Sequence, residues 1–332
     1  MDFGKRELAA AMLLGSAVPL AAASAGAEPT YPQRPITLVV GYPVGGATDT
    51  LARLLGQHMA EVFGQRVIIE NRAGAASNIA AQSVARTPPD GYTLFLSSRP
   101  NTLHKTLYAG LDYDFAKDLV PVALVATMPT VIITGPDSSI SSVSDLISMA
   151  KNYPGTLTCA SSGFGTTGHL LCELFQEETG VSLEHIPYKG SAPALNDLMA
   201  GRVDVQFDAL PATIGQIRAG SVRLISAISR RRLAIAKDVP TARESGLTSV
   251  DIEDWAGIMV PTGTPPNVIA RLNACLNAAL MRPELQNAFI DRGYVAPVAP
   301  NTPETFRTLI GQENARWAPL LQRRTLKPVS QP

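Results

Sequence analysis

The chain passes from a strand into a helix through the glycine-rich turn VVGYPVGGATD, residues 39–49, and does so again through CASSGFGTT, residues 159–167. Apolar residues at helical spacing follow each turn, from Leu51 and from Leu170 onward. A helix N-terminus presents free backbone N–H groups and the positive end of the helix dipole. Glycines let a ligand approach that backbone closely. Each turn is therefore predicted to bind an anion, and the two together suit a small acid held from both sides.

Apolar β-branched runs alternate with amphipathic segments from Pro35 onward, which predicts an α/β fold of mainly parallel sheets covered by helices on both faces. Ligands in such sheets bind outside the carboxyl ends of the strands, where both glycine-rich turns lie. Strands are expected at 36–40, 67–70, 92–96, 120–125, 130–134, 156–160, 183–186, 203–207, 222–226 and 255–260. Gly64 and Gly180 are expected to end the helices that follow the two turns, and Ser77 to cap the next helix.

The 332 residues are too many for one ordinary hydrophobic core, so two lobes are expected. The segments near 125–130 and 226–232 read as two crossings between them. We predict that lobe 1 is discontinuous, with residues 28–126 plus 232–332, and that lobe 2 spans 127–231. A hinge of two strands permits closure over a ligand.

The N-terminus reads as a secretory signal peptide, residues 1–27. Lys5 and Arg6 precede an apolar run over 8–20, and small residues lead to a cleavage site after Ala27. The alternative is an uncleaved anchor, but the run is short for a span of about 20 residues. We therefore expect a periplasmic protein.

Charge and cysteine content exclude other classes. Lys plus Arg and Asp plus Glu both number 28, a balance that argues against nucleic acid as a partner. Cys159, Cys172 and Cys275 are too few and too scattered for a disulfide framework. They are expected to be buried as small apolar residues, with a Cys159–Cys172 bridge left open as the alternative.

One pattern favours a different function. GFGTTG, residues 163–168, matches the dinucleotide motif G-x-G-x-x-G, and Glu184 lies 21 residues after Gly163, near where a ribose-binding acid would stand. A remote alternative is therefore an NAD(P)-dependent oxidoreductase. Export, the unexplained turn at 39–49 and the alternating pattern around Glu184 weigh against it.

Catalysis is not expected. No G-x-S-x-G nucleophile turn occurs, and His58, His104, His169 and His185 lack metal-binding spacing. We therefore predict no catalytic residue, no metal and no cofactor.

Three charged residues have two interpretations each. Asp49 either binds a ligand amine or stabilises the first helical turn. Asp208 either receives a ligand ammonium or hydroxyl group or caps the turn at Pro211. Arg99 either reaches a second ligand carboxylate or is a solvent-facing rim residue.

Seven motifs occur in order along the whole mature chain: YPQRPI (31–36), PVGGATD (43–49), ENRAG (70–74), PDGYTL (89–94), SSGFGT (161–166), PYKGSAPA (187–194) and DVPT (238–241). Together they resemble the Bug family, the extracytoplasmic solute receptors of tripartite tricarboxylate transporters. The resemblance implies a type II periplasmic binding protein fold with a Venus-flytrap closure. It also implies capture of a small carboxylate by the backbone amides of both turns, helped by ordered waters.

Carried over position by position, the resemblance and the residues together predict a ligand-binding set. The sequence departs from the family at Arg99-Pro100-Asn101, at Tyr42 and at Phe164, where larger side chains shrink the pocket or stack on an aromatic acid. The predicted ligand-binding residues are Tyr42, Val44, Gly45, Gly46, Ala47, Thr48, Asp49, Ser97, Ser98, Arg99, Ser162, Gly163, Phe164, Gly165, Thr166, Thr167 and Asp208.

The function expected from the sequence is an exported solute-binding receptor that captures a small organic carboxylate for a tripartite tricarboxylate-type transporter. Its expected partners are that acid and integral-membrane transporter subunits, with the receptor itself a monomer. The alternative is an exported sensor that presents its ligand state to a membrane partner without transport.

Overall fold

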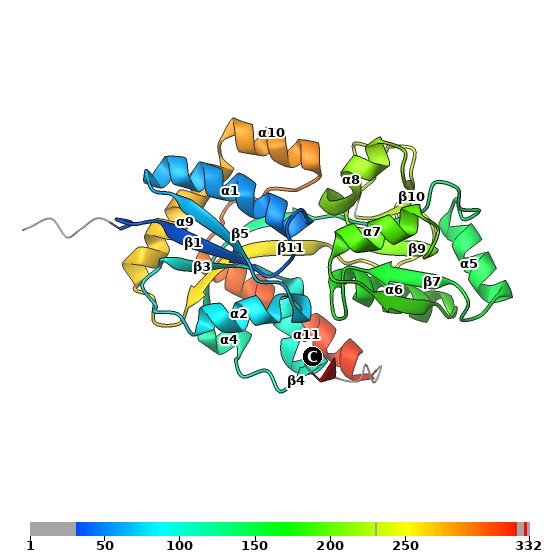
Figure 1. Ribbon diagram of the computed structural model, residues 1–332, viewed down its shortest axis with the longest axis horizontal. Coiled ribbons are helices and arrows are strands. Elements are labelled where there is room, and N and C mark those ends of the chain that lie inside the picture. Colours follow the sequence, from blue (N-terminus) through cyan, green and yellow to red (C-terminus); the bar gives the residue numbers. More distant parts are fainter. Residues whose placement is uncertain (1–30, 230, 324–328, 331–332) are drawn as a thin grey trace, which may run out of the picture. The chain divides into compact units, whose positions relative to one another are not determined.

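Two five-stranded sheets organise the protein, as a computed structural model of residues 31–229, 231–323 and 329–330 shows (Figure 1). The signal peptide predicted at 1–27 lies outside the described residues. The first sheet has the strand order β2-β1-β3-β11-β5, and the second has the order β10-β6-β9-β7-β8. The α/β fold predicted from the alternating pattern is confirmed.

The strands of the first sheet are β1 (Ile36–Val40), β2 (Val67–Asn71), β3 (Thr93–Ser98), β5 (Leu119–Met128) and β11 (Asp254–Pro261). Those of the second are β6 (Thr130–Thr134), β7 (Thr158–Ser161), β8 (Glu184–Pro187), β9 (Val205–Ala209) and β10 (Arg223–Ile228). A separate short pair joins β4 (Tyr108–Ala109) to β12 (Val329–Ser330).

Each sheet contains an antiparallel strand in the same place, next to one edge. β11 runs against β3 and β5, and β6 runs against β9 and β10. The reason is the path of the chain. β5 ends at the edge facing the second sheet, so its continuation β6 runs away from that edge, and β11 returns in the same way after β10. The two predicted crossings therefore account for the departure from an all-parallel pattern.

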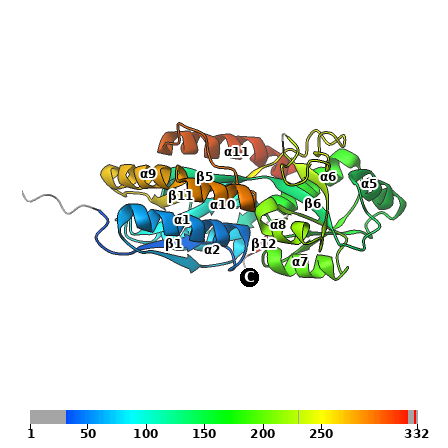
Figure 2. The same cartoon turned by 90° about the horizontal axis from the view of Figure 1, so that it is seen from above.

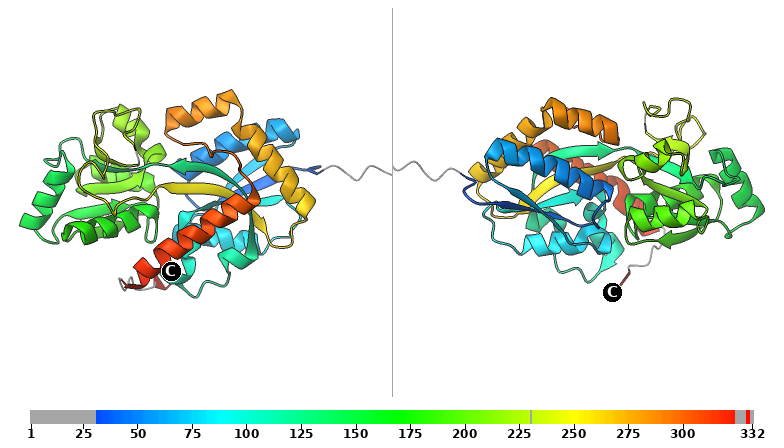
Figure 3. Two further views of the ribbon diagram at one scale, coloured as in Figure 1. Left: turned by 180° about the vertical axis from the view of Figure 1, so that it is seen from behind. Right: turned by 45° about the horizontal axis from the view of Figure 1, so that its top comes forward.

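Alternating residues on β1 place helices on both faces of the first sheet, since neighbouring side chains point to opposite sides. Leu38 packs with α1 (Ala47–Phe63), α9 (Pro266–Leu280) and α10 (Pro283–Arg292). Val39 packs with α2 (Asn78–Ala85), α4 (Phe115–Asp118) and α11 (Pro303–Arg323) on the other face. Figure 1 shows helices on both sides of this sheet, Figure 2 shows α1, α9 and α10 together on one side, and Figure 3 shows α11 lying across the other.

The second sheet is covered in the same way. α5 (Val143–Asn152) and α6 (Thr167–Thr179) cover one face, and α7 (Ser191–Met199) and α8 (Leu210–Arg218) cover the other. Residues from Leu233 to Ile252 also pack against this sheet, so a boundary drawn from packing lies near Glu253 rather than at 231. The division into lobes itself stays a prediction.

Two helices end at the glycines that the sequence predicted. Gly64 and Gly180 end α1 and α6 in the left-handed conformation, with φ of 66° and 67°. The prediction that Ser77 caps α2 is wrong, because Ser77 has a φ of 76° and its side chain makes no capping hydrogen bond. Elements that were not predicted from the sequence are α8, the short α3 (His104–Leu107) and α4, and the 3₁₀ turns Ala75–Ser77 and Arg99–Leu103.

The three cysteines are free and buried, as their scattered positions predicted, and Cys159 and Cys172 form no bridge. Within the described ranges, no helix combines the length and the apolar character that crossing a membrane requires.

Candidate functional site

Three helix N-termini meet at one pocket between the two sheets. Gly46, Thr166 and Gly190 precede α1, α6 and α7, and none of these helices has a side-chain cap. The uncapped first turns therefore offer backbone N–H groups and positive dipole ends to the space between them. Two of these N-termini belong to the predicted glycine-rich turns, and the third was not predicted as part of the site.

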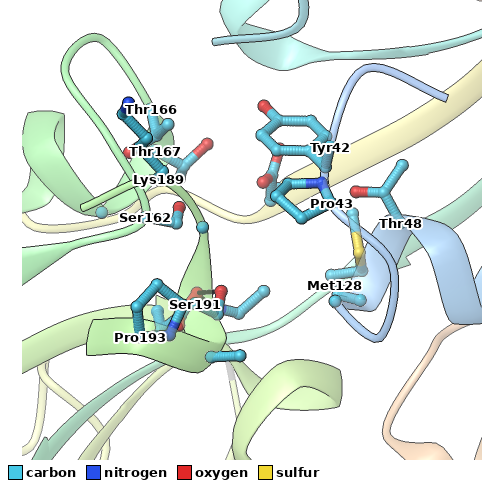
Figure 4. A pocket seen from close by; sticks show the side chains of 18 of the residues that line it. Tyr42, Pro43, Thr48, Met128, Ser162, Thr166, Thr167, Lys189, Ser191 and Pro193 are labelled. Carbon is cyan, nitrogen blue, oxygen red and sulfur yellow. Dashed lines mark hydrogen bonds between the residues drawn. The ribbon is translucent and has the colours of Figure 1, made fainter. Parts of the chain in front are cut away.

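The pocket at these N-termini, which we call the cleft pocket, has a volume of about 60 Å³. One water needs about 10–15 Å³ by the same measure, so the cleft pocket by itself has room for a group the size of a few waters. Figure 4 shows Ser162, Thr166 and Thr167 opposite Tyr42 and Thr48. The pocket is lined by Tyr42, Pro43, Val44, Gly46, Ala47, Thr48, Met128, Ser162, Thr166, Thr167, Gly168, Lys189, Gly190, Ser191, Ala192, Pro193, Asp208, Ala209 and Asp254.

The first turn is held in place by Asp49 from within. The Asp49 carboxylate is 2% exposed and accepts hydrogen bonds from Gly45 N at 2.9 Å, from Arg53 at 2.9 and 3.0 Å, and from Asn71 Nδ2 at 2.9 Å. Burial opposes its charge, but these donors hold the pKa of Asp49 below its ordinary value. Asn71 Nδ2 also donates to Tyr42 O at 3.0 Å. Asp49 thus acts on the turn and does not line the pocket, which fits the helix-turn interpretation.

The second turn rests on two stacked histidines. The rings of His169 and His185 lie 4.0 Å apart, and His169 Nδ1 accepts a hydrogen bond from Gly165 N at 3.0 Å. His185 Nε2 lies 2.7 Å from Ser161 Oγ. Burial, followed by the charge of His185, lowers the pKa of His169 to about 3, and burial lowers that of His185 to about 4. Both rings are therefore neutral at physiological pH and serve to position the turn.

Two glycines in this turn adopt conformations that other residues avoid. Gly163 has a φ of 144° and Gly165 a φ of 73°. The carbonyl of Gly163 accepts a hydrogen bond from Thr166 Oγ1 at 2.7 Å, and the carbonyl of Phe164 accepts one from Tyr108 OH at 2.6 Å. Both carbonyls therefore accept hydrogen bonds within the protein. The part of the turn that lines the cleft pocket is the start of α6, at Thr166 and Thr167.

The third turn was part of the family resemblance in the sequence, but its residues were not predicted as ligand contacts. It comprises Tyr188, Lys189, Gly190 and Ser191, and Gly190 has a φ of 114°. A Cβ at Gly190 would lie 3.3 Å from Pro43 Cγ, so this turn touches the first. The sequence pattern that could have predicted this turn as part of the site is the one it shares with the other two turns: a strand ends, a glycine follows and a helix begins.

Two aspartates line the cleft pocket, of which one was predicted. Asp208 is 5% exposed, and burial raises its pKa to about 6 even though Ser191, Ala209 and Gln206 donate hydrogen bonds to it. Asp254 was missed by sequence reasoning. Burial raises the pKa of Asp254 as well, although the positive charge of Arg99 lowers it in part.

The residues at the end of β3 do not form the predicted carboxylate clamp. Arg99 is 1% exposed and pairs with Glu313 Oε2 at 3.1 Å, while its Nη2 donates to Glu253 O at 3.1 Å and its guanidinium lies 5.0 Å from the Trp317 ring. Arg99 is thus neither a pocket residue nor a rim residue, because α11 covers it. Ser97 donates to Gly257 O, and Ser98 Oγ lies 3.3 Å from Tyr42 OH, so both support the site from behind.

A second, larger cavity of about 410 Å³ adjoins the cleft pocket and shares Tyr42, Pro43, Ser162, Lys189 and Gly190 with it. The predicted residues Gly163 and Phe164 line this side pocket rather than the cleft pocket. Gly45 and Gly165 line neither cavity. In the described part of the chain, no three His, Cys, Asp or Glu side chains come together as a metal site would require.

The dinucleotide motif has a structural explanation. A Cβ at Gly168 would lie 2.2 Å from Phe207 O, so this glycine allows α6 to pack closely on β9. Glu184 is the first residue of β8, at the end of the strand away from the turn. Ligands bind at the carboxyl ends of such strands, so Glu184 lies at the wrong edge of the sheet for a ribose.

The fold and the cleft between its two sheets define a periplasmic binding protein. A family model described as tripartite tricarboxylate transporter family receptor matches residues 51–326. The chain therefore belongs to this family, and the resemblance to the Bug family is confirmed. The family is one of periplasmic solute-binding receptors that serve transporters.

Individual relatives align with this chain over most of their length. BugT of Bordetella pertussis is 38% identical over 291 residues, which cover 87% of this chain and 89% of BugT. The structure of R. palustris Rpa4515 with adipate has a TM-score of 0.86 at 34% identity and covers 90% of this chain and 100% of that one. MatC from Rhodopseudomonas palustris, with bound malate, has a TM-score of 0.83 at 33% identity and covers 88% of this chain and 100% of that one.

Proposed function

We propose that this protein captures a small organic carboxylate in the cleft pocket and delivers it to a transporter. The observation that carries this proposal is the convergence of three uncapped helix N-termini on one small cavity. Backbone N–H groups at such ends bind anions without any positively charged side chain. Two family members whose structures hold adipate and malate support the same ligand class.

The ligand contacts proposed from the sequence divide into direct and supporting groups. Direct contacts come from pocket-lining residues, and supporting residues hold the turns. We assign Tyr42, Val44, Gly46, Ala47, Thr48, Ser162, Thr166, Thr167 and Asp208 to the first group, and Gly45, Asp49, Ser97, Ser98, Gly163, Phe164 and Gly165 to the second.

Further parts of the proposal concern the setting of the receptor. It is exported by the segment 1–27 with cleavage after Ala27, acts as a monomer and binds integral-membrane transporter subunits. Its two lobes close over the ligand about the β5–β6 and β10–β11 crossings. It binds without catalysis, as expected for a member of a family of solute-binding receptors.

A thermal-shift screen of the purified protein tests the binding function. A ligand that binds the folded state alone must raise the melting temperature. We expect a concentration-dependent rise with one or more small carboxylic acids and none with nicotinamide dinucleotides. A shift with dinucleotides alone would contradict the proposal.

A matched pair of glycine variants tests whether the ligand binds in the cleft pocket. A Cβ at Gly46 would meet no atom closer than Pro43 O at 3.7 Å, so Gly46→Val is compatible with the fold while it fills the pocket. Gly311→Val, on the exposed side of α11 with open space around it, is the control. We expect Gly46→Val to abolish the thermal shift and Gly311→Val to retain it. Equal binding by both variants would exclude the cleft pocket as the site.

A further inference from the structure

The charged side chains around the cleft pocket do not suit a ligand that carries negative charge alone. Asp208, Asp254 and Lys189 line it, so carboxylates outnumber cations. Lys189 is exposed and forms no ion pair with any residue that the structure describes. A ligand that carried negative charge alone would meet two carboxylates for each cation, and like charges close together disfavour binding.

Asp208 is fixed in place as an acceptor. Its Oδ1 accepts hydrogen bonds from Ser191 Oγ at 3.0 Å and from Ala209 N at 2.8 Å, and its Oδ2 accepts one from Gln206 Nε2 at 2.7 Å. These donors are neutral, so they orient the carboxylate without neutralising it. The Asp208 carboxylate therefore faces the pocket with its charge uncompensated by the protein.

Asp254 forms no ion pair with any described residue. Its Oδ1 accepts a hydrogen bond from Trp255 N at 2.9 Å, and Arg99, whose positive charge lowers the pKa of Asp254 in part, is itself paired with Glu313. The Thr167 hydroxyl lies close enough to Asp254 to lower its pKa, yet this buried group makes no hydrogen bond of ordinary geometry to any described residue. A hydroxyl and a carboxylate are thus both available at the same side of the pocket.

In the part of the chain that the structure describes, Arg99 supplies the positive charge that acts on this pair of carboxylates. The titratable groups that act on Asp208 and Asp254 are each other, Tyr42, Arg99 and Glu313. Burial of uncompensated carboxylates is costly unless a cation or a strong donor meets them. A ligand that brought such a group would relieve this cost on binding.

We propose that the ligand is a zwitterion, a small carboxylic acid that also bears a protonated amine, and that Asp208 and Asp254 receive its ammonium group. This inference rests on the proposed carboxylate-binding function and narrows its substrate class. The ligand carboxylate lies at the N-terminus of α1, with Lys189 at the edge of the same pocket. The Thr167 hydroxyl accepts one ammonium proton beside Asp254.

Matched probes of two to six carbons test the charge requirement by isothermal titration calorimetry at neutral pH. The unsubstituted acids, from acetate to hexanoate, carry a carboxylate alone, and the ω-amino acids, ω-hydroxy acids and dicarboxylates of the same lengths add one group each. At the best chain length, we expect the amino acid to bind about tenfold to a hundredfold more tightly than the unsubstituted acid, since a hydrogen bond to a charged group contributes that much. The dicarboxylate should bind most weakly.

Variants of the two aspartates assign the effect to this pair. Asp254→Asn and Asp208→Asn should each remove most of the preference for the amino acid and improve binding of the dicarboxylate of the same length. Asp238→Asn, an exposed residue outside both cavities, is the control and should leave the preference unchanged.

Different results would overturn the zwitterion inference alone or together with the proposed carboxylate-binding function. Tighter binding of dicarboxylates or of unsubstituted acids than of amino acids would overturn the zwitterion inference and leave carboxylate capture standing. Equal binding of hydroxy and amino acids would also overturn it, because a neutral donor would then suffice. Failure of every probe to bind would overturn the proposed function and this inference with it.

Discussion

Replacing Arg99 by methionine tests whether this side chain stabilises the fold or binds the ligand. Sequence position suggested a clamp for a second carboxylate, whereas the structure places Arg99 under α11. There it pairs with Glu313 at 3.1 Å, donates to Glu253 O at 3.1 Å and lies 5.0 Å from the Trp317 ring. Methionine retains much of the length and apolar volume and removes the charge.

The magnitude follows from how deeply the pair is buried. Arg99 is 1% exposed and the Glu313 side chain 14% exposed, so removing one partner leaves a largely desolvated charge, which costs about 3–5 kcal/mol. Two features reduce this cost. Glu313 keeps a hydrogen bond from Trp317 Nε1 at 3.1 Å, and Nε and Nη1 of Arg99 have no hydrogen-bond partner among the described residues. We therefore expect a loss near the lower end, about 3 kcal/mol.

Urea denaturation measures the loss, and a double-mutant cycle assigns it. Arg99→Met, Glu313→Gln and the double variant should show a coupling energy of about 1–3 kcal/mol, because the two side chains are in direct contact. Calorimetry with butyrate and succinate completes the test. The ratio of their affinities should be the same for Arg99→Met as for the unmodified protein, since Arg99 does not line the pocket.

One combination of results would refute the description of Arg99 as a structural residue. It is a change in unfolding free energy within about 0.5 kcal/mol, the usual range for surface substitutions, together with a selective loss of succinate affinity. Arg99 would then reach the ligand in solution, and its pairing with Glu313 would not govern its role.

Three other predictions concern the turns and their pH dependence. Gly168→Ala places a Cβ 2.2 Å from Phe207 O and should lower the unfolding free energy in urea by about 1–3 kcal/mol, whereas an unchanged value would mean that α6 shifts freely. Burial raises the pKa of Asp208 from 3.8 to about 6, so its contribution to stability is full below pH 3.8 and is lost as the pH rises through about 6. Asp208→Asn should therefore remove a decline in unfolding free energy over that interval, and a parallel decline in the variant would contradict this assignment. The lowered pKa of His185, about 4 against an ordinary 6.5, has the opposite sign, because its stability is present above pH 6.5 and is lost as the pH falls through about 4. His185→Gln, which retains a partner for Ser161 Oγ, should make unfolding less sensitive to acid, and an unchanged acid sensitivity would rule out His185 as its source.

The parts of the fold and of the site that could be predicted are those that depend on residues next to one another in the sequence. A strand, a glycine and a helix follow one another within residues 36–63 and again within 158–179, so local patterns indicated both turns, and the glycines at the helix ends indicated where α1 and α6 stop. The third turn, before α7, has the same local pattern. Its residues were not predicted as contacts, because two facing turns already suffice to hold a small acid from both sides.

The residues that sequence reasoning misplaced depend on partners distant in the chain. Arg99 directly follows a strand that points toward the cleft, yet Glu313 and Trp317, more than 200 positions later, determine where its side chain lies. Asp254 follows a long segment without clear periodicity, and its place in the pocket depends on the return of the chain from the second sheet. Long-range pairing of this kind leaves no local pattern to read.

The crossings between the sheets also form part of the binding site. Asp254 begins β11, Met128 ends β5, and the two residues are paired across these neighbouring strands. Both line the cleft pocket, so a ligand that contacts Asp254 touches the segments about which closure is proposed. Charge at Asp254 therefore bears on both affinity and closure, since an ammonium group there would stabilise one arrangement of the crossing strands. Asp254→Asn should therefore alter ligand preference and also reduce the compaction on ligand binding that small-angle scattering measures, and an unchanged compaction would contradict a role for Asp254 in closure.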